Sequence, residues 1–452
     1  MSRPNILFIV ADDLNSWIGA LGRHPDVRTP GIDALAERGT IFTHAYCSAP
    51  YCNASRMGVF TGCLPSTTGI FQNENFWDNP ERRKSFLELL GDAGYYRMGA
   101  GKVFHGHFNY AEAGRTGADH AKWIEVENRS FLWEDFHTIP SEPMPPERPL
   151  NQMFDFTRFD EVSPWNHHFD WGALAAGREN EMPDSVTCHI VSDLLRAPPS
   201  QPFFCAAGLY KPHLPWYAPQ RFFDLYPLEN VSLPFVKKDD LDDVPAIARS
   251  WAESPPDHAT VTAHGEWRNA VRGYLACISY CDSLVGQLIE ALDRSPASDN
   301  TIVVLWGDNG FHLGEKLHWR KFVLWEEATR VPLVIIPPKG TDVVPRIDEP
   351  VSLIDIFPTL FDLCGLTPIE GIDGQSLLPS MRGEQKASKG AVSTWLPGNH
   401  SLRKDHWRYT RYSDGAEELY DHSSDPYEWH NLALFSRLTQ KLDEMRAYLP
   451  SA

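Results

Sequence analysis

The sequence predicts an α/β fold with a large, mostly parallel sheet flanked by helices, followed by a small C-terminal antiparallel α+β subdomain. Over residues 1–383, short continuous apolar runs alternate with amphipathic helical patterns, which is the order typical of a parallel sheet. The apolar runs lack polar alternation, and this indicates strands that are buried on both faces. From residue 384 the pattern changes to short alternating strands, which predicts a second, smaller unit over 384–452.

Each element follows from a local signal. Residues 5–10 form a solid apolar run, and Thr29-Pro30 opens a helix that Gly39 stops. Residues 274–292 carry leucine and isoleucine near helical spacing, which predicts the most strongly marked helix. The remaining predicted strands are 40–43, 203–207, 301–305, 331–336 and 407–412, and the remaining predicted helices are 55–61, 86–93, 184–195 and 434–448.

Residues 107–180 interrupt this order. They are rich in Trp, Phe, His, Pro and acidic residues and show no clean period. Loops of this length without secondary structure are uncommon unless they serve a function. We therefore interpret 107–180 as a long surface insertion within a catalytic domain that spans 1–383.

The charge balance narrows the class of partner. Lys and Arg number 41 against 60 Asp and Glu, which gives a formal net charge of −19. A nucleic-acid or anionic-membrane surface would need a basic face, so neither partner is expected. A small anionic substrate is compatible with this charge, because a basic pocket or a bound cation can reverse the local field. The sequence does not indicate an oligomeric state.

The sequence also bears on location and on the cysteines. No stretch approaches the roughly 20 continuous apolar residues that cross a bilayer. The chain runs from Met1 straight into an apolar strand, without the parts of a secretory signal. We therefore expect a cytoplasmic protein, or a periplasmic one if a signal has been removed. The eight cysteines show no paired metal-ligand spacing, so most are interpreted as buried thiols.

Chemically active side chains follow five predicted strands at the point where each strand ends. In open parallel sheets, ligands bind outside the carboxyl ends of the strands. We therefore expect these side chains to converge on one pocket. They are Asp12-Asp13, Cys52 with Arg56, Lys102 with His105, Lys211 with His213, and Asp308-Asn309.

Three carboxylates and one amide in this set are hard oxygen ligands. Asp12, Asp13, Asp308 and Asn309 together suit Ca²⁺ or Mg²⁺. A cation would also cancel the repulsion between acids that otherwise could not all stay ionised in one cleft. Taken alone, Asp-Asp after a strand and Asp-Asn-Gly are ordinary turn sequences, so the prediction depends on their convergence.

Cys52 stands where a helix begins, with Arg56 one turn further along the same face. The helix N-terminus offers free N–H groups, and the guanidinium is a forked donor for tetrahedral oxyanions. Two other interpretations stay open at this point. One is a buried thiol beside an arginine, and the other is a low-pKa catalytic cysteine with a histidine base that spacing does not identify.

In series, these motifs resemble the type I sulfatases of the alkaline phosphatase superfamily over nearly the whole chain. Residues 101–105, 211–215 and 314–332 are similar to the iduronate-2-sulfatase-like branch. The resemblance implies an alkaline phosphatase-like fold and a sulfuric ester hydrolase. The other matching segments are Pro4-Asn5-Ile6 through Asp12-Asp13, residues 50–62, Gly101-Lys102, Asp308-Asn309-Gly310, Leu419-Tyr420-Asp421, Asp425-Pro426 and Asn431-Leu432-Ala433.

The resemblance implies that a maturation enzyme oxidises Cys52 to formylglycine, whose hydrated form is the nucleophile. The family pattern is C-x-P-x-R, and Ala54 replaces the proline in this chain. This departure bears on the maturation route more than on the role of Cys52. The resemblance also implies a metal ion, usually Ca²⁺, with Mg²⁺ or Mn²⁺ as alternatives. Its implied ligands are Asp12, Asp13, Asp308, Asn309 and the modified Cys52.

Roles for the other residues follow from the same resemblance. Arg56, Lys102 and Lys321 would neutralise the charge on the sulfate. His213 and Lys321 would protonate the departing alkoxide, and His105 would take a proton from the second hydroxyl of the nucleophile, which expels sulfate. The predicted substrate contacts are Trp216, His312, His318 and Arg403.

The expected substrate is a small-molecule or oligosaccharide sulfate ester, with the 2-O-sulfate of a uronate-containing saccharide as the first candidate. An alkylsulfatase, a choline-sulfatase and a phosphonate or phosphodiester hydrolase are enzymatic alternatives, because the superfamily shares the metal and the nucleophile. The non-enzymatic alternative is a protein that binds sulfated ligands with Cys52 unmodified.

Overall fold

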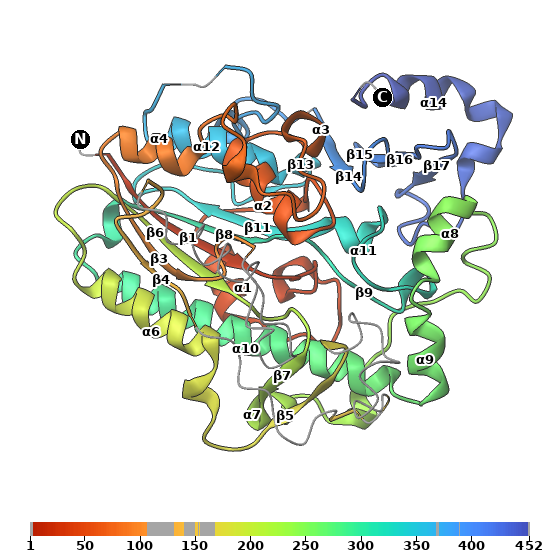
Figure 1. Ribbon diagram of the computed structural model, residues 1–452, viewed down its shortest axis with the longest axis horizontal. Helices are drawn as coiled ribbons and strands as arrows, with labels where there is room; N and C mark the ends of the chain where they lie inside the picture. The colour runs from red at the N-terminus through yellow and green to blue at the C-terminus, as the bar shows by residue number, and fades with distance from the viewer. Residues whose placement is uncertain are drawn as a thin grey trace.

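The computed structural model describes residues 3–105, 131–139, 150–151, 153, 168–367, 370–387 and 389–450. It confirms the predicted class: a large central sheet flanked by helices, and a small antiparallel sheet near the C-terminus (Figure 1). Most of the predicted insertion 107–180 lies outside the described residues. The predicted division of the chain between residues 383 and 384 stays a prediction.

The central sheet is mostly parallel. Among the described residues it has nine strands, which are β1 (Asn5–Ala11), β2 (Thr40–Tyr46), β3 (Tyr96–Gly101), β4 (Asp135–His137), β6 (Phe203–Leu209), β8 (Thr301–Gly307), β11 (Arg330–Ile336), β12 (Arg346–Ile347) and β13 (Val351–Ser352). Their order is β12-β2-β11-β8-β1-β6-β3-β4, with β13 paired to β2. Strand β11 is antiparallel to β2 and β8, and all other pairings are parallel. The parallel strands β8, β1, β6 and β3 therefore present their carboxyl ends at one edge.

Helices cover both faces of this sheet (Figure 1). One face carries α1 (Pro30–Ala36), α6 (Pro183–Arg196) and α10 (Trp267–Asp293), and the other carries α2 (Cys52–Thr61), α4 (Phe86–Asp92) and α12 (Ile356–Leu363). In β1, Leu7 and Ile9 pack in the cluster that contains α10, whereas Phe8 and Val10 pack in the cluster that contains α2. Because successive side chains of a strand point to opposite faces, the unbroken apolar run serves both clusters.

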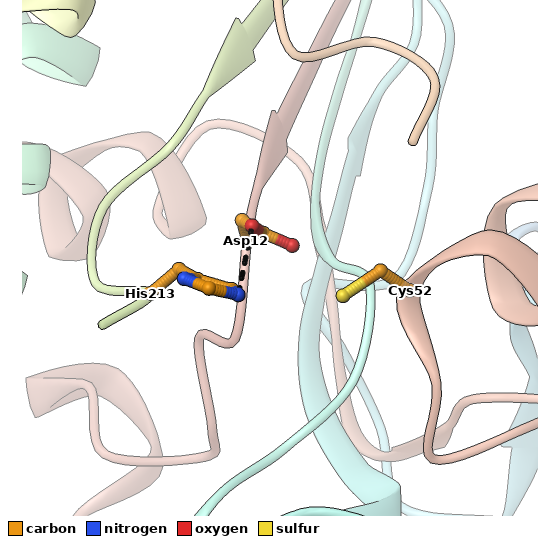
Figure 2. A group of neighbouring side chains, drawn as sticks. All are labelled: Asp12, Cys52 and His213. Atoms are coloured by element: carbon orange, nitrogen blue, oxygen red, sulfur yellow. Dashed lines mark ion pairs between the residues drawn. The ribbon is translucent and has the colours of Figure 1, made fainter. Parts of the chain in front are cut away.

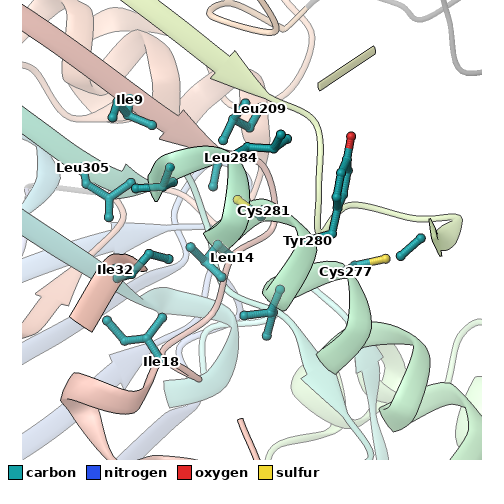
Figure 3. Packing of buried hydrophobic residues seen from close by; sticks show 14 of the residues in the cluster. Ile9, Leu14, Ile18, Ile32, Leu209, Cys277, Tyr280, Cys281, Leu284 and Leu305 are labelled. Atoms are coloured by element: carbon teal, nitrogen blue, oxygen red, sulfur yellow. The ribbon is translucent and has the colours of Figure 1, made fainter. Parts of the chain in front are cut away.

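Helix α10 is the core helix of the first face. It includes the predicted helix 274–292 and begins earlier, at Trp267. Figure 3 shows Leu284 of this helix close to Ile9, Leu209 and Leu305 of three neighbouring strands. By length and composition α10 could span a membrane, but 78% of its apolar window is buried inside the protein. The helix is thus explained by packing against the sheet.

Short elements connect these parts. They are α3 (Pro65–Thr68), β5 (Trp171–Leu174), β7 (Trp216–Pro219), α7 (Gln220–Phe223), α8 (Ala246–Ala252), α9 (Asp257–Ala263), β9 (His312–Leu313), β10 (Trp319–Arg320), α11 (Glu326–Thr329) and α13 (Leu378–Met381). Strand β5 pairs with β7, and β9 pairs with β10. The long segment between β8 and β11 therefore contains its own small hairpin.

The C-terminal part is a four-stranded antiparallel sheet. It consists of β14 (Ala391–Thr394), β15 (His400–Lys404), β16 (Trp407–Arg411) and β17 (Glu417–Asp421), and α14 (Thr439–Arg446) follows it. Leu402, Tyr409 and Leu419 of the sheet form a cluster with Leu442 and Met445 of the helix. This small core is separate from the two clusters that flank the central sheet.

The predicted helix 434–448 is wrong at its beginning. Two 3₁₀ turns, Leu432–Leu434 and Ser436–Leu438, precede α14. Leu434 is 68% exposed and Phe435 is 46% exposed, so these apolar side chains do not continue the buried stripe of the helix. The Asn431 side chain accepts a hydrogen bond from the Ala433 N–H, which favours a turn at this point.

Buried polar contacts join the C-terminal sheet to α11. Glu326 accepts a hydrogen bond from Arg408 of β16, and its N–H donates to Glu428 Oε2 at 3.0 Å. Beside it, Trp325 Nε1 donates to Glu418 Oε2 of β17 at 2.7 Å. All five side chains are buried. Because a buried charge is costly without its partner, each side of this interface depends on the other.

Candidate active site

An acidic cluster lies at the carboxyl ends of β1 and β8. These strands are adjacent and parallel, and a polar pair follows each of them. The Asp13 N–H donates to Asp308 Oδ1 at 2.9 Å. Carboxylate oxygens of Asp12, Asp13 and Asp308 lie within 4.8 Å of one another, and all three residues are buried. The structure therefore brings these three side chains together, as the strand-end argument expected.

Asp13 has a backbone conformation that is rare for a residue with a side chain. Its φ is 59°, in the left-handed region. Its carbonyl accepts a hydrogen bond from the Tyr274 hydroxyl at 2.7 Å, and Tyr274 belongs to α10. The core helix thus holds a strained residue in the cluster, and strain of this kind is concentrated at functional sites.

Cys52 is the first residue of α2, and its thiol faces the cluster. The Sγ atom lies 3.9 Å from Asp13 Oδ1 and 2.7 Å from Lys321 Nζ. Figure 2 shows Cys52 and His213 on opposite sides of Asp12, with both side chains directed toward it. Burial and the negative charge of Asp12 raise the pKa of the Cys52 thiol well above its ordinary value. An unmodified Cys52 is therefore a neutral thiol, which argues against a low-pKa catalytic cysteine.

Arg56 of α2 forms ion pairs with two carboxylates of the acidic cluster. It is fully buried, and its Nε bonds Asp308 Oδ2 at 2.9 Å while its Nη2 bonds Asp12 Oδ1 at 3.2 Å. Its Nη1 donates to the Val103 carbonyl at 3.0 Å. The guanidinium thus links the ends of β1, β3 and β8 through one planar group, which suits the fork geometry of arginine.

Two lysines also form ion pairs with carboxylates of the acidic cluster. Lys102, after β3, pairs with Asp12, and Lys321 pairs with Asp13. Burial raises the pKa of Asp12, but the positive charges of Lys102 and other neighbours outweigh it and hold the pKa well below its ordinary value. At Asp308 the balance is reversed, because burial and the charge of Asp12 raise the pKa to about 7. Arg56, Lys102 and Lys321 thus match the three carboxylates in number, and burial is the main cause of the raised pKa of Asp308.

The donor set of the cluster fits a divalent cation. Asn309 Nδ2 donates to Asp13 Oδ1 at 2.7 Å, whereas Asn309 Oδ1 is buried without a hydrogen-bond partner among the described residues. An orphaned buried oxygen beside three carboxylates is the kind of ligand set that hard cations take.

The two predicted catalytic histidines, His213 and His105, lie at different positions relative to the acidic cluster. His213 Nε2 lies 4.0 Å from Asp12 Oδ2 and 3.7 Å from Asp13 Oδ2, and its side chain is 22% exposed. Burial lowers the pKa of His213 to about 4. His105 is half-buried, and its ring lies 6.2 Å from the ring of Tyr51, the residue before Cys52. His213 thus borders the cluster, while His105 lies near the start of α2.

The four predicted substrate contacts are buried, and their role stays a prediction. Trp216 is fully buried and stacks on Trp171 at a ring distance of 5.6 Å. His312 and His318 each direct a ring nitrogen at a backbone carbonyl, and Arg403 donates to two carbonyls of its own hairpin. Their burial depends on tertiary packing, which the sequence motifs did not show.

Sequence reasoning missed the residues that hold the Lys321 segment. Lys316, Leu317, Arg320 and Phe322 have positive φ values of 50° to 77°, so this segment is strained. Its anchors are the ion pair of Arg320 Nε with Asp257 Oδ2 at 2.5 Å, and the contact of His318 Nε2 with the Lys321 carbonyl at 2.9 Å. Asp257 begins α9, far from any strand end, and no motif marked it.

Replacing Asp257 with alanine is expected to destabilise the protein by about 3–5 kcal/mol, because it leaves a buried guanidinium without its partner. The pair is 6% and 5% exposed. Urea unfolding measures the change. Asp193→Ala is the matched control, because it breaks a pair with Arg196 that is 74% and 60% exposed. A loss of stability no larger for Asp257→Ala than for the control would show that the ion pair does not anchor this segment.

Two solved structures share this fold. The fold matches a phosphonate monoester hydrolase of Agrobacterium radiobacter with a TM-score of 0.76 and 19% identity, over 99% of this chain and 96% of that chain. It matches a 2-O GAG sulfatase with a TM-score of 0.71 and 21% identity, over 99% of this chain and 91% of that chain. The chain thus shares its fold with a phosphonate monoester hydrolase and a sulfatase.

The sequence itself identifies the family. The sulfatase family model matches residues 4–366, and the model of the C-terminal part of N-sulphoglucosamine sulphohydrolase matches residues 314–451. The chain therefore belongs to the sulfatase family and is a sulfuric ester hydrolase, which confirms the predicted class of enzyme. This family is metal-dependent and uses formylglycine. The non-enzymatic alternative is set aside.

Individual relatives cover most of the chain. A sulfatase of Formosa agariphila is 37% identical over 100% of this chain and 87% of its own length. A choline-sulfatase of Rhizobium meliloti is 29% identical over 95% of this chain and 82% of its own length. Iduronate 2-sulfatase of Homo sapiens is 27% identical over 91% of this chain and 79% of its own length.

Proposed function

We propose that this sulfatase hydrolyses the 2-O-sulfate of a uronate-containing saccharide, with Cys52 in its formylglycine form as the nucleophile. The names of two similar proteins, iduronate 2-sulfatase and a 2-O GAG sulfatase, support the substrate class. The observation that carries the mechanism is the position of Cys52. Its Sγ stands at the beginning of α2, faces the acidic cluster and lies 2.7 Å from Lys321 Nζ.

The acidic cluster is proposed as the metal site. Asp12, Asp13, Asp308 and Asn309 would hold a divalent cation, with Ca²⁺ as first candidate and Mg²⁺ or Mn²⁺ as alternatives. When bound, the cation would supply positive charge to a sulfate oxygen and to the formylglycine hydrate. A maturation enzyme that oxidises Cys52 is part of the proposal, because the unmodified thiol has a raised pKa and is a poor nucleophile.

Three cations are proposed to bind and stabilise the sulfate. Arg56, Lys102 and Lys321 each contact a carboxylate of the cluster, so their charges are in place before a substrate enters. Positive groups that are fixed in this way stabilise charge on an anion and on its transition state without further reorganisation. Their burial strengthens the effect, because little water screens them.

His213 is proposed to carry the proton for the departing alkoxide, together with Lys321. The Nδ1 of His213 lies 2.5 Å from the Leu214 carbonyl, so Nδ1–H donates to that carbonyl and leaves Nε2 facing the cluster. A bound sulfate anion would raise the pKa of His213 from its buried value and favour the protonated ring. His105, near Tyr51, is proposed as the base that accepts a proton from the second hydroxyl of the nucleophile.

The test is sulfate release from a 2-O-sulfated unsaturated uronate disaccharide by protein matured in its native host. The matched control is a disaccharide with its sulfate at the 6-position of the glucosamine. We expect kcat/KM to be at least about 100-fold higher for the 2-O-sulfate, because a site built around one hydroxyl position discriminates strongly. Equal rates, or preference for the 6-O-sulfate, would contradict the proposed substrate. Peptide mass spectrometry of residue 52 in the same sample checks the modification.

Choline sulfate is the second candidate substrate. The choline-sulfatase of Rhizobium meliloti is 29% identical over 95% of this chain, which is the observation that favours it. Its kcat/KM, and that of a phosphonate monoester, should be measured on the same preparation as the disaccharide. A value for choline sulfate above that for the 2-O-sulfated disaccharide would transfer the assignment to the alkyl ester.

A further inference from the structure

The segment that follows β6, residues 210–215, carries His213 to the edge of the acidic cluster (Figure 2). We name it the His213 segment. The His213 N–H donates to the Tyr210 carbonyl at 3.0 Å, which closes a turn. Pro212 and Pro215 have no N–H group, so the backbone of this segment has fewer donors with which to hold its own shape. The segment therefore needs anchors from other parts of the protein.

A carboxylate of α6 holds the beginning of the His213 segment. Asp184 lies in the first turn of that helix and is buried. Its Oδ1 accepts a hydrogen bond from the Tyr210 N–H at 2.6 Å, and its Oδ2 accepts one from the Lys211 N–H at 2.8 Å. Hydrogen bonds to an ionised carboxylate are strong, and two of them to successive backbone groups fix the direction of the chain as well as its position.

The orientation of the His213 ring depends on Tyr210. The Leu214 carbonyl lies 2.5 Å from His213 Nδ1 and accepts a hydrogen bond from the Tyr210 hydroxyl at 3.0 Å. The ring of Tyr210 lies 4.8 Å from the ring of His213, and Lys102 Nζ lies 4.9 Å from the centre of the same Tyr210 ring. Tyr210 therefore contacts two side chains that are proposed to act on the sulfate ester, and the backbone of Tyr210 is held by Asp184.

We propose that Asp184 is a positioning residue for proton transfer to the leaving group. Through the backbone of Tyr210, it keeps the His213 ring where Nε2 faces the acidic cluster. The inference rests on the proposed role of His213 as the proton donor. Proton transfer needs a heavy-atom distance of about 2.6–3.2 Å, and a displacement of about 1 Å can lower a rate by about 100-fold. A loosened His213 segment should therefore slow the step that requires the proton.

The alternative is that Asp184 only stabilises the fold. The two roles differ in how the loss of activity depends on the leaving group of the substrate. A sugar alkoxide is a strong base and needs a proton as it leaves, whereas 4-nitrophenolate is a weak base and leaves without one. A positioning role predicts a loss that is confined largely to the sugar ester. A purely structural role predicts the same loss for both esters.

The test compares kcat/KM for the 2-O-sulfated disaccharide and for 4-nitrophenyl sulfate in the matured full chain. Asp184→Asn keeps one acceptor oxygen for the two N–H groups, so the fold should survive. We expect kcat/KM to fall by about 10–100-fold for the disaccharide and by no more than about threefold for the aryl ester. Tyr210→Phe removes only the hydroxyl that bonds the Leu214 carbonyl, and it should show the same selectivity with a loss of about fivefold.

Asp282→Asn is the matched control. Asp282 of α10 is also buried, and it accepts hydrogen bonds from the successive N–H groups of Gly31 and Ile32 at 3.1 and 2.7 Å. These groups belong to α1, which carries none of the proposed site residues. Asp282→Asn should lose stability in urea much as Asp184→Asn does. Its ratio of kcat/KM for the two esters should nevertheless stay within about twofold of the unaltered protein.

His213→Ala separates this inference from the proposed function. It should show the same selectivity with a larger loss, about 10²–10⁴-fold for the disaccharide. If His213→Ala is selective and Asp184→Asn lowers both rates equally or neither, Asp184 is not a positioning residue and His213 keeps its role. If His213→Ala does not distinguish the two esters, the proposed proton donor is wrong and this inference falls with it. Choline sulfate replaces the disaccharide in all variants if it is the faster alkyl ester, so the comparison does not depend on the sugar.

Discussion

Replacing Cys52 with alanine is expected to lower kcat by at least about 10⁴-fold, because loss of a covalent nucleophile leaves only charge and binding to act on the ester. The fold should survive, since the thiol is small and the helix that it begins is anchored by Arg56. Sulfate release measures the activity, and urea unfolding measures the stability of the same preparation.

Cys63→Ala is the matched control for this substitution. Cys63 is also a buried thiol and lies just beyond the other end of α2. Because its Sγ donates to the Thr61 carbonyl and Cys63 is not part of the acidic cluster, the activity of Cys63→Ala should stay within about twofold of the starting value. Equal sulfatase activity in Cys52→Ala and Cys63→Ala would show that Cys52 is not the nucleophile.

Removal of the metal is expected to abolish turnover and to lower the melting temperature. Carboxylate oxygens of Asp12, Asp13 and Asp308 lie within 4.8 Å of one another, and a cation that binds only this folded site stabilises the native state by mass action. Dialysis against a chelator, followed by addition of Ca²⁺, Mg²⁺ or Mn²⁺ in separate samples, measures both effects. The ion that restores activity at the lowest free concentration identifies the metal.

The substitution Asn309→Ala tests the proposed metal site through a single ligand. It removes the buried amide oxygen that lacks a partner and should weaken metal affinity by about 10–100-fold, with less harm to the fold than loss of a carboxylate. Asp299→Asn, at an exposed ion pair, serves as the control for loss of a surface group. Full activity after exhaustive chelation, with the metal content checked by mass spectrometry, would exclude the proposed metal site.

The sequence predicted most of the sheet and the acidic part of the site. A parallel sheet has one edge where strand ends meet, so Asp12, Asp13 and Asp308 could be brought together from order and pattern alone. The start of α2 at Cys52 followed from the same logic. These predictions succeeded because they depend on the order and direction of the strands. The pattern of apolar residues in the sequence indicates both.

The failures have a different physical origin. The burial of Trp216 and Arg403 by packing was not apparent from the sequence. The anchor of the Lys321 segment, Asp257, meets Arg320 across 63 residues of chain. The helix predicted from residue 434 begins instead at Thr439. Each of these features depends on contacts between residues that are distant in the sequence. A local sequence pattern does not predict such contacts.

The interface between α11 and the C-terminal sheet has a consequence for dividing the chain. Glu326 is enclosed with Arg408, and the N–H of Glu326 is satisfied by Glu428. A fragment cut at residue 383 would lose Arg403 and Arg408 and leave Arg330 as the remaining guanidinium partner of Glu326. We therefore expect a chain shortened at residue 383 to be less stable, because the C-terminal strands supply two buried partners of Glu326.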